Sequence, residues 1–452
     1  MKKTLLSIIA SLLLLPFLAA QTSFYASDIN QTLADDAIVR SWDNGKAAIT
    51  YYEIGLKKYI QYVDYQTGNS YRAAAPDSVQ ILDMYIYNDM VYYCGFSVFD
   101  TGGVGVVGYF KPVEFISSTH VDYHTLTVSP LKYVKKLVVQ ENPTAGGIDV
   151  IAIGENKWYD TVFNAAGHVI QLIPHLDRYF LFCRDIMQTT VSYEYGEVPP
   201  DEHYYDVLLT DNYVVFVGAA SYLSQYSSCI RATTRTNTSY PTWQLDKIYI
   251  YPTGGTEIYS ATHSVATNKD SIASAYMHIN PSTGAVSNRV RIFDIASMDM
   301  VYSQEYIVPD KSEVRDIVYI PQDNSLVCMQ DFDTPLNLYN SNFVYLNPTA
   351  TVNYNAYIEF IMGKFFKSIT KKSHKHYLAS NGPVWFLKDK LSIGAYPYPF
   401  CPQGEEIKCK VLKNIEKMLN TIPITPLPDS NIIIQDRKLI ETRNISVICN
   451  NP

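Results

Sequence analysis

A short pattern of an aspartate, an apolar run, a polar turn and a second apolar run recurs along this chain. Its three clearest copies span 83–94 (DMYIYNDMVYYC), 206–217 (DVLLTDNYVVFV) and 316–328 (DIVYIPQDNSLVC). Asn and Asp tolerate the positive φ of tight turns, so each copy predicts a β-hairpin. A repeated hairpin predicts an array of small sheets, because one such unit cannot bury its faces alone.

Weaker copies of the same pattern lie before, between and after these three. They begin at residues 36, 136, 263 and 376, which gives seven starts separated by 47 to 70 residues. A four-stranded propeller blade takes about 40–50 residues plus its loops. The spacing therefore predicts an all-β fold, a β-propeller of about seven blades over residues 21–400. A further hairpin pattern at 168–183 leaves six or eight blades open.

The composition agrees with strands until the chain nears its carboxy terminus. Tyrosine occurs 38 times, and aromatic and β-branched side chains suit a pleated, half-buried surface. Within 405–419, apolar residues recur at every fourth position from Ile407 to Leu419, which predicts one helix. We expect residues 401–452 to form a small C-terminal appendage containing this helix, with a ring-closing segment as the alternative.

The amino terminus has the features of a signal peptide over residues 1–20. Two lysines precede an apolar stretch at 5–18, and small Ala19 and Ala20 offer a cleavage site. After its removal no stretch is long and apolar enough to predict a transmembrane segment. We therefore expect an exported protein that is periplasmic, on the cell surface or extracellular.

The net charge bears on the class of partner. It is −8 for the whole chain, and loss of the two lysines with the signal peptide makes it −10. Affinity for nucleic acid depends largely on basic contacts with phosphates. The sequence therefore predicts no nucleic-acid partner.

The seven cysteines fall into groups with different expected states. Cys94 and Cys328 end recurring hairpins where the third copy has Val217, so we expect both to be unpaired and buried. Three cysteines near the carboxy terminus are candidates for at most one disulfide, with the last of them as one partner: Cys401, Cys409 and Cys449.

One segment has spacing suited to a metal. His120, Asp122 and His124 alternate, and alternate residues of a strand share one face. Two imidazoles and a carboxylate are ligands that zinc accepts, but an exposed strand face also carries such residues without a metal. We predict no other cofactor.

The candidates for ligand binding are aromatic. Tryptophan rings stack on sugars, but they fill propeller cores as often. The chain has four, all near expected strands or turns: Trp42, Trp158, Trp243 and Trp385.

Repeat architectures commonly present binding surfaces, so we expect a non-enzymatic protein that binds a carbohydrate or a protein ligand. One alternative is an extracytoplasmic glycoside hydrolase or lyase, in which carboxylates from several blades would converge with shifted pKa values. A second alternative is a structural subunit of a cell-envelope complex, which would expose a broad apolar patch. The sequence identifies no catalytic residue.

Overall fold

A computed structural model describes the backbone of part of the chain. The described residues are 23–27, 36–43, 46–64, 69–99, 102–129, 131–142, 146–163, 169–184, 186–187, 192–198, 202–222, 225–236, 242–243, 247–251, 263–279, 286–306, 313–321, 324–333, 339–346, 352–360, 368–373, 376–380, 384–388, 403–408, 410–411, 416–418, 422–423, 425–426 and 433–450. Side-chain surroundings are described for a smaller set, mostly within 36–329 and 434–442. The predicted signal peptide, residues 1–20, lies outside the described residues.

The described residues are almost entirely strand, so the prediction of an all-β chain is confirmed. The helix among them is the four-residue α2 (Glu114–Ser117). Most strands belong to antiparallel meanders of four strands, in which each strand pairs with the next along the chain. The first meander is β2 (Asp36–Trp42), β3 (Ala47–Ile54), β4 (Lys57–Asp64) and β5 (Asn69–Ala74).

Further meanders follow in chain order. The second is β6 (Val79–Tyr87), β7 (Met90–Phe99), β8 (Gly102–Phe110) and β9 (His120–Thr127). The third is β10 (Tyr133–Glu141), β11 (Ile148–Phe163), β12 (Val169–Arg184) and β13 (Ser192–Val198). The fourth is β14 (Glu202–Leu209), β15 (Tyr213–Tyr222), β16 (Gln225–Thr234) and β18 (Lys247–Tyr251).

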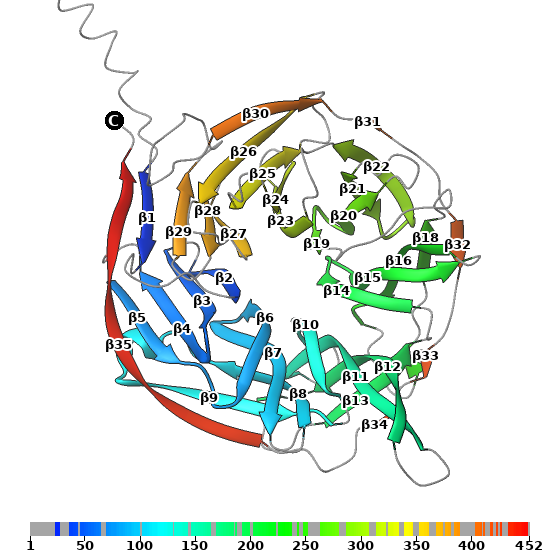
Figure 1. The fold of residues 1–452 in the computed structure, drawn as a ribbon, viewed down its shortest axis with the longest axis horizontal. Coiled ribbons are helices and arrows are strands. Elements are labelled where there is room, and N and C mark those ends of the chain that lie inside the picture. Colours follow the sequence, from blue (N-terminus) through cyan, green and yellow to red (C-terminus); the bar gives the residue numbers. More distant parts are fainter. Residues whose placement is uncertain are drawn as a thin grey trace, which may run out of the picture.

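The fifth meander is β19 (His263–Ala266), β20 (Ser271–Ile279), β21 (Val286–Asp294) and β22 (Asp299–Tyr306). The sixth is β23 (Glu313–Ile320), β24 (Ser325–Asp333), β25 (Tyr339–Leu346) and β26 (Val352–Phe360). The meanders are arranged around a central axis, with the first strand of each nearest the axis (Figure 1).

The two ends of the chain meet in one sheet. The strands β27 (Ser368–Ser373), β28 (His376–Ser380) and β29 (Val384–Lys388) pair in order, and β1 (Ser23–Ser27) pairs with β29. The sheet is therefore built from both termini of the described chain, and it lies between the sixth and the first meander (Figure 1).

The helix predicted over 405–419 is not found among the residues of this range that the structure describes, which form short strands instead. They add to the outer edges of the meanders: β30 (Gln403–Lys408) to β26, β31 (Lys410–Val411) to β22, and β32 (Glu416–Met418) to β18. An outer strand has an unpaired row of backbone groups, while an isolated helix of this length is marginal in water. Pairing with the sheet edges thus competes successfully with the helical pattern.

The same segment continues along the outside of the molecule. The short strands β33 (Ile422–Pro423) and β34 (Thr425–Pro426) pair with β17 (Thr242–Trp243) and β13. The last strand, β35 (Ile433–Asn450), pairs in turn with β9, β5 and β1 (Figure 1).

Side chains hold part of β35 against these sheets. Lys438 forms an ion pair of 2.6 Å with Asp77, and Glu441 forms one of 2.9 Å with Arg72. The half-buried side chain of Ile440 packs against the hydrophobic cluster between the first two meanders. A single strand near the carboxy terminus therefore joins three sheets whose strands lie far from it in the sequence.

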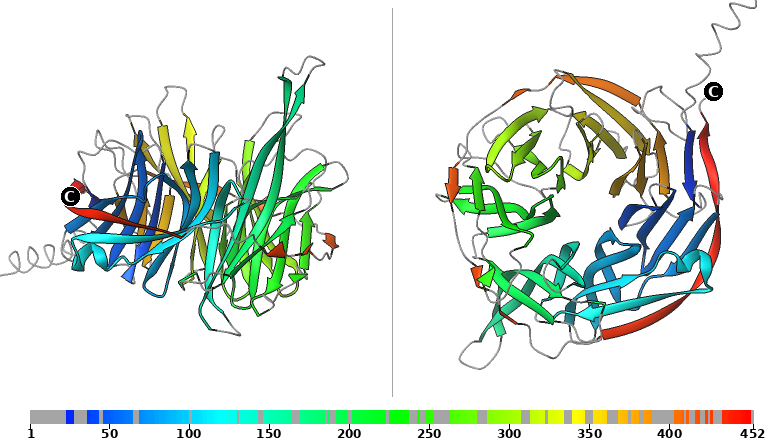
Figure 2. Two further views of the ribbon diagram at one scale, coloured as in Figure 1. Left: turned by 90° about the horizontal axis from the view of Figure 1, so that it is seen from below. Right: turned by 180° about the vertical axis from the view of Figure 1, so that it is seen from behind.

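The strands β11 and β12 explain the hairpin-like pattern at 168–183. Both are 16 residues long and pair along their whole length, so this pattern is one long strand and does not begin another meander. Figure 2 shows the two strands extending beyond the rest of the molecule. The extra length accounts for the largest interval between hairpin starts.

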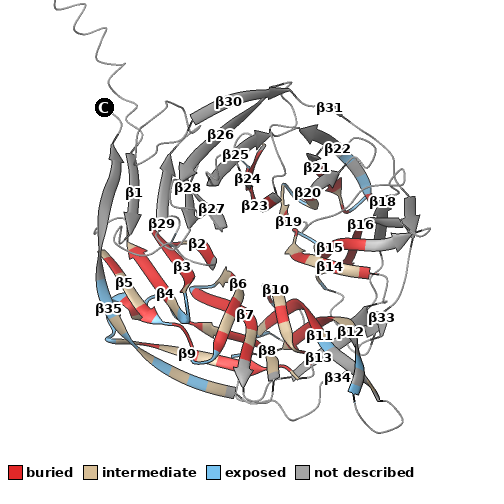
Figure 3. Ribbon diagram, viewed as in Figure 1, coloured by how far each residue is buried: buried red, intermediate tan, exposed pale blue. Residues whose placement is uncertain are grey.

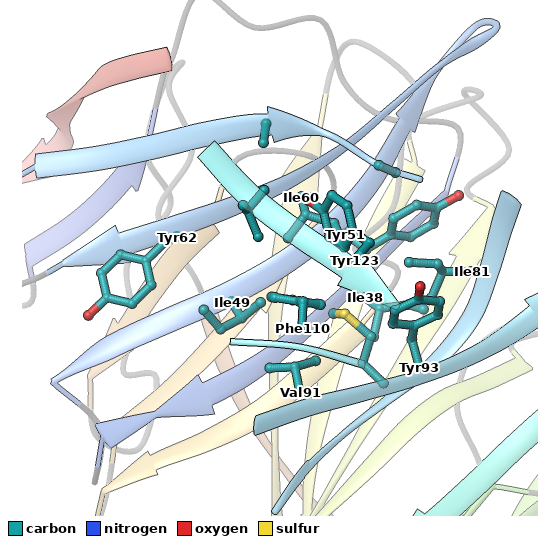
Figure 4. Packing of buried hydrophobic residues seen from close by; sticks show 14 of the residues in the cluster. Ile38, Ile49, Tyr51, Ile60, Tyr62, Ile81, Val91, Tyr93, Phe110 and Tyr123 are labelled. Carbon is teal, nitrogen blue, oxygen red and sulfur yellow. The ribbon is translucent and has the colours of Figure 1, made fainter. Parts of the chain in front are cut away.

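The core lies between successive meanders (Figure 3). The side chains of β2–β4 pack against those of β6–β9 in a cluster that includes Ile49, Tyr51, Val91 and Phe110 (Figure 4). Similar clusters of buried side chains lie between the second and third meanders and between each later pair up to the sixth. Alternate residues of each strand thus face opposite neighbours, as expected for a sheet buried on both sides.

Candidate functional site

A cavity of about 510 Å³ lies where the innermost strands approach one another. Its lining includes residues of β2, β6, β10, β14, β19 and β23, so six meanders contribute to it. Five of the lining residues have acidic or basic side chains: Arg40, Asp83, Lys136, Asp206 and Asp316. Its volume is within the range of small-molecule sites.

Four of these charged residues occupy the same place in the backbone. Each follows a register shift in its innermost strand, where one extra residue interrupts the pairing with the second strand. The residues that follow the shift are Asp83, Lys136, Asp206 and Asp316. A bulge of this kind redirects the neighbouring side chain, and here the redirected side chains line the cavity.

Three of the bulges are matched by a glycine on the second strand. Gly95, Gly154 and Gly218 pair with the residue just before the register shift. A Cβ atom on Gly95 would lie 1.8 Å from the Gln80 carbonyl oxygen, and one on Gly218 would lie 2.0 Å from that of His203. The backbone of the bulged strand therefore occupies the space that a side chain would need.

Asp83 is held by groups from two neighbouring meanders. Its Oδ1 lies 2.6 Å from Nη2 of Arg40 and 3.8 Å from Nζ of Lys136. Its Oδ2 accepts a hydrogen bond of 3.3 Å from the backbone N–H of Leu137. Asp83 therefore connects β6 to both β2 and β10.

Asp206 makes a similar connection without a close cation. Its Oδ2 accepts a hydrogen bond of 3.0 Å from the N–H of Ser264 on β19, and its Oδ1 accepts one of 3.0 Å from the N–H of Val207. Asp316 accepts a hydrogen bond of 2.9 Å from the N–H of Ile317. An aspartate after the bulge can thus link its innermost strand to that of the next meander.

His263 occupies the corresponding place in the fifth meander. Leu137 follows Lys136 and Ser264 follows His263, and both donate their N–H to the aspartate of the preceding meander. Successive meanders therefore place alternating acidic and basic residue types around the axis, in the order Asp83, Lys136, Asp206, His263 and Asp316.

Burial and neighbouring charges shift the pKa values of three of these groups. Desolvation, assisted by Asp83, raises the pKa of Asp206 to about 7 against the opposing charge of Lys136. Desolvation and then Lys136 lower the pKa of His263 to about 4. Burial disfavours the charged form of Lys136, but Asp83 and Asp206 outweigh it and raise its pKa. With His263 neutral, the acidic groups that line the cavity between β14 and β23 are Asp206 and Asp316, and the charge of Arg315 on β23 also acts on His263.

A second polar cluster lies between the third and fourth meanders. Glu155 accepts hydrogen bonds from Tyr133 and Lys135, and Nε2 of His203 lies 3.5 Å from its Oε1. Burial would raise the pKa of Glu155, but the hydrogen bond and charge of Lys135 reverse this and lower it. Desolvation and then Lys135 lower the pKa of His203 to about 4. The polar side chains of this cluster contact one another, and this favours a structural role for them.

The predicted metal ligands lie on β9, where all three are half-buried on one face. Asp122 pairs with Arg437 at 3.2 Å, His124 stacks on Tyr109, and His120 Nδ1 lies 2.9 Å from the Thr119 hydroxyl. No group of three His, Cys, Asp or Glu side chains among the described residues could hold a metal ion. The metal site stays a prediction that these contacts do not favour.

The structure describes the side chain of one of the four tryptophans, Trp42. Trp42 is 9% exposed and belongs to the hydrophobic cluster between the first two meanders, so its side chain has a core position. The side chains of the other three lie outside the described ones: Trp158, Trp243 and Trp385.

The prediction for Cys94 and Cys328 is confirmed, since both are buried free thiols. The prediction that Cys94 and Cys328 occupy the same place in their hairpins is wrong, however. Asp83 pairs with Cys94 and Asp206 with Val217, but Asp316 pairs with Met329, because the third hairpin has a longer turn. Cys328 consequently faces the preceding meander, whereas Cys94 faces the following one. The disulfide candidates lie outside the described side chains: Cys401, Cys409 and Cys449.

No protein family matches the chain, and no curated protein matches it.

Among the described helices, none has the length and apolar character required to span a bilayer.

Proposed function

We propose that this chain is an exported β-propeller of seven blades whose central cavity binds a ligand without catalysing a reaction. The six meanders and the sheet of β27, β28, β29 and β1 would be the blades. The pairing of β1 with β29 supports this, because a blade built from both ends of a chain closes a ring. The predicted signal peptide at 1–20 supports export.

The observation that carries the binding function is the convergence of charged side chains on one cavity. Asp83, Lys136, Asp206 and Asp316 come from four meanders and are directed by the same backbone bulge. A small polar ligand in this cavity would contact several innermost strands at once.

An enzyme acting on a polar substrate is the second candidate. Asp206 has a pKa of about 7, a value suited to a general acid or base near neutral pH. Both of its oxygens, however, accept hydrogen bonds from backbone N–H groups of the innermost strands. These bonds fix the position of the carboxylate, but the described side chains show no second acid or base paired with it, and for this reason we place binding first.

An envelope subunit has less support. Apart from Val113 and Ile116, which both lie at α2, the large apolar side chains that are well exposed among the described residues lie on separate elements, and they do not suggest one broad patch. They are Leu56, Val113, Ile116, Val169, Met187, Val301 and Leu439.

The test is a ligand screen that compares the wild type with a variant whose cavity is filled. Ala266 lines the cavity, and Ala266→Trp would occupy it, whereas Ala74→Trp places the same side chain on the exposed face of β5. A panel of glycans and small polar molecules is screened by thermal shift, because a ligand that binds the folded state raises the melting temperature. We expect a stabilising ligand whose effect is lost with Ala266→Trp and kept with Ala74→Trp.

Two results would contradict this function. A ligand that stabilises both variants equally would bind elsewhere on the molecule. Hydrolysis of a polysaccharide in the panel, abolished by Asp206→Asn in a folded protein, would favour the enzyme.

A further inference from the structure

We infer that the arc of the central cavity between β14 and β23 binds the protonated amine of a small organic ligand, with Asp206 as its acceptor. This inference rests on the proposed function, which requires a ligand in the cavity but does not specify its chemistry. It follows from the charges of the residues that line the cavity and from the distances between them.

The basic side chains that line the cavity, Arg40 and Lys136, converge on Asp83. Arg40 contacts its carboxylate at 2.6 Å and also donates to the carbonyl oxygens of Val39 and Met84. Lys136 lies 3.8 Å from the same carboxylate oxygen. This part of the cavity therefore holds two cations beside one carboxylate.

Asp206 is in a different situation. Its side chain is buried, and the hydrogen bonds described for it come from two neutral backbone N–H groups. No Lys or Arg among the described side chains lies within ion-pair distance of its carboxylate. The alternation of acidic and basic residues would place a cation beside Asp206 at His263, but burial and Lys136 keep that imidazole neutral near pH 7.

A ligand amine would supply a positive charge in direct contact with Asp206, whereas Lys136 acts on this carboxylate from beyond ion-pair distance. Asp206 lines a cavity that can admit a small molecule, and Asp316 adds a second carboxylate to the same lining. An ammonium group beside a buried carboxylate makes a charge-assisted hydrogen bond and favours the ionised form of the acid. The apolar and tyrosine side chains of the lining, such as Val207 and Tyr85, suit the carbon skeleton of such a ligand.

The inference specifies a pH dependence. The charged groups that act on Asp206 are Lys136 on β10 and Asp83 on β6, and its pKa of about 7 places its ionisation in an accessible range. The titratable and charged groups of the next two innermost strands are His263 on β19 and Arg315 and Asp316 on β23. Below that value the protonated acid offers no negative charge to an amine. Affinity should therefore rise as the pH increases to about 7 and then level off.

The experiment uses three probes with the same four-carbon skeleton: putrescine, butanediol and succinate. Saturation-transfer NMR on the full mature chain measures binding of each between about pH 6 and pH 8, where putrescine remains charged. A second arm compares glucosamine with glucose at about pH 7, which distinguishes an amino sugar from an alkyl amine as the source of the charge. The variants are Asp206→Asn, Asp206→Glu and Asp43→Asn. The last is a control, because Asp43 is an exposed residue in the turn after β2 and forms an ion pair with Lys46.

We expect an amine to bind, its uncharged and anionic counterparts not to bind, and its affinity to fall at least about tenfold with Asp206→Asn, equivalent to about 1.4 kcal/mol. Asp206→Glu should retain part of the affinity and Asp43→Asn all of it. If Asp206→Asn does not fold, the probe comparison and the pH profile of the wild type still decide the question.

The contrary outcomes distinguish a failure of the amine assignment from a failure of the proposed binding function. If butanediol, glucose or succinate binds as well as an amine and Ala266→Trp removes the signal, the cavity binds ligands but the amine assignment is wrong. The same holds if amine binding is unchanged by Asp206→Asn or weakens as the pH rises to about 7. If no probe binds and the wider panel also finds no cavity ligand, both proposals fail.

Discussion

The carboxylate of Asp206 accepts a hydrogen bond of 3.0 Å from the backbone N–H of Ser264, 58 residues further along the chain. The bond joins the innermost strands of two successive meanders. Asp83 makes the same kind of bond with Leu137. The recurrence of aspartate at the start of the hairpins thus has a structural reason that is separate from any function of the cavity.

The first prediction concerns the ion pair between Arg40 and Asp83. Asp83→Asn removes the partner of a side chain that is 24% exposed and weakens the bond to Leu137, so it should lower the free energy of unfolding by about 2–3 kcal/mol. Urea denaturation measures the change. The control Asp43→Asn removes an exposed ion pair and should change it by less than about 1 kcal/mol. Equal effects of the two variants would contradict the arrangement at Asp83.

The second prediction concerns the glycines opposite the bulges. Gly218→Ala places a Cβ atom 2.0 Å from the His203 carbonyl oxygen, and we expect it to destabilise the protein by about 2–3 kcal/mol. Gly103→Ala is a matched control in β8, because the nearest atom to its Cβ would lie at 3.6 Å, an ordinary contact. Thermal unfolding of both variants provides the measurement. A stable Gly218→Ala protein would show that the bulge in β14 is absent.

The third prediction concerns His203 and acid. The folded state lowers its pKa from 6.5 to about 4, so between these values the unfolded chain binds more protons at this site than the folded one. The contribution of His203 to stability is therefore present above pH 6.5 and is lost as the pH falls towards 4. His203→Gln should reduce the acid sensitivity by at least about 1.4 kcal/mol over this range, the equivalent of one pKa unit.

Unfolding free energies of the wild type and His203→Gln are compared at both ends of the range. Other acid-sensitive groups act in both proteins, so the difference between the two isolates His203. Parallel pH profiles would contradict burial of His203 beside Lys135 and Glu155.

The sequence predicted the all-β class because local turn chemistry and apolar runs specify hairpins without reference to distant residues. The predicted hairpin starts at 83, 136, 206, 263 and 316 are also the residues of the innermost strands that lie around the central axis. The start at 376 did not, since it begins β28 and not the innermost β27. Pattern matching located hairpins but could not show which pair of strands in a meander each one forms.

Three features escaped prediction for physical reasons. The longer turn after Asp316 shifts its cross-strand partner to Met329, and a shift of one residue exchanges the faces of a strand. The strands within 405–419 depend on sheet edges that only the folded molecule presents. The role of the cavity residues arises from a bulge, for which the glycine after the second apolar run, as in Gly95 and Gly218, was the available signal.

The most direct test of the central claim is the pKa of the Asp206 side chain, measured by carbon NMR of its labelled carboxyl group. The claim is that residues of successive hairpins meet in one buried cavity, where Lys136 on β10 acts on Asp206 on β14. We predict a pKa of about 7 in the wild type and a higher value in Lys136→Met, because removing the lysine removes a charge that favours the carboxylate. A pKa close to the ordinary 3.8 that is unchanged in Lys136→Met would contradict the claim.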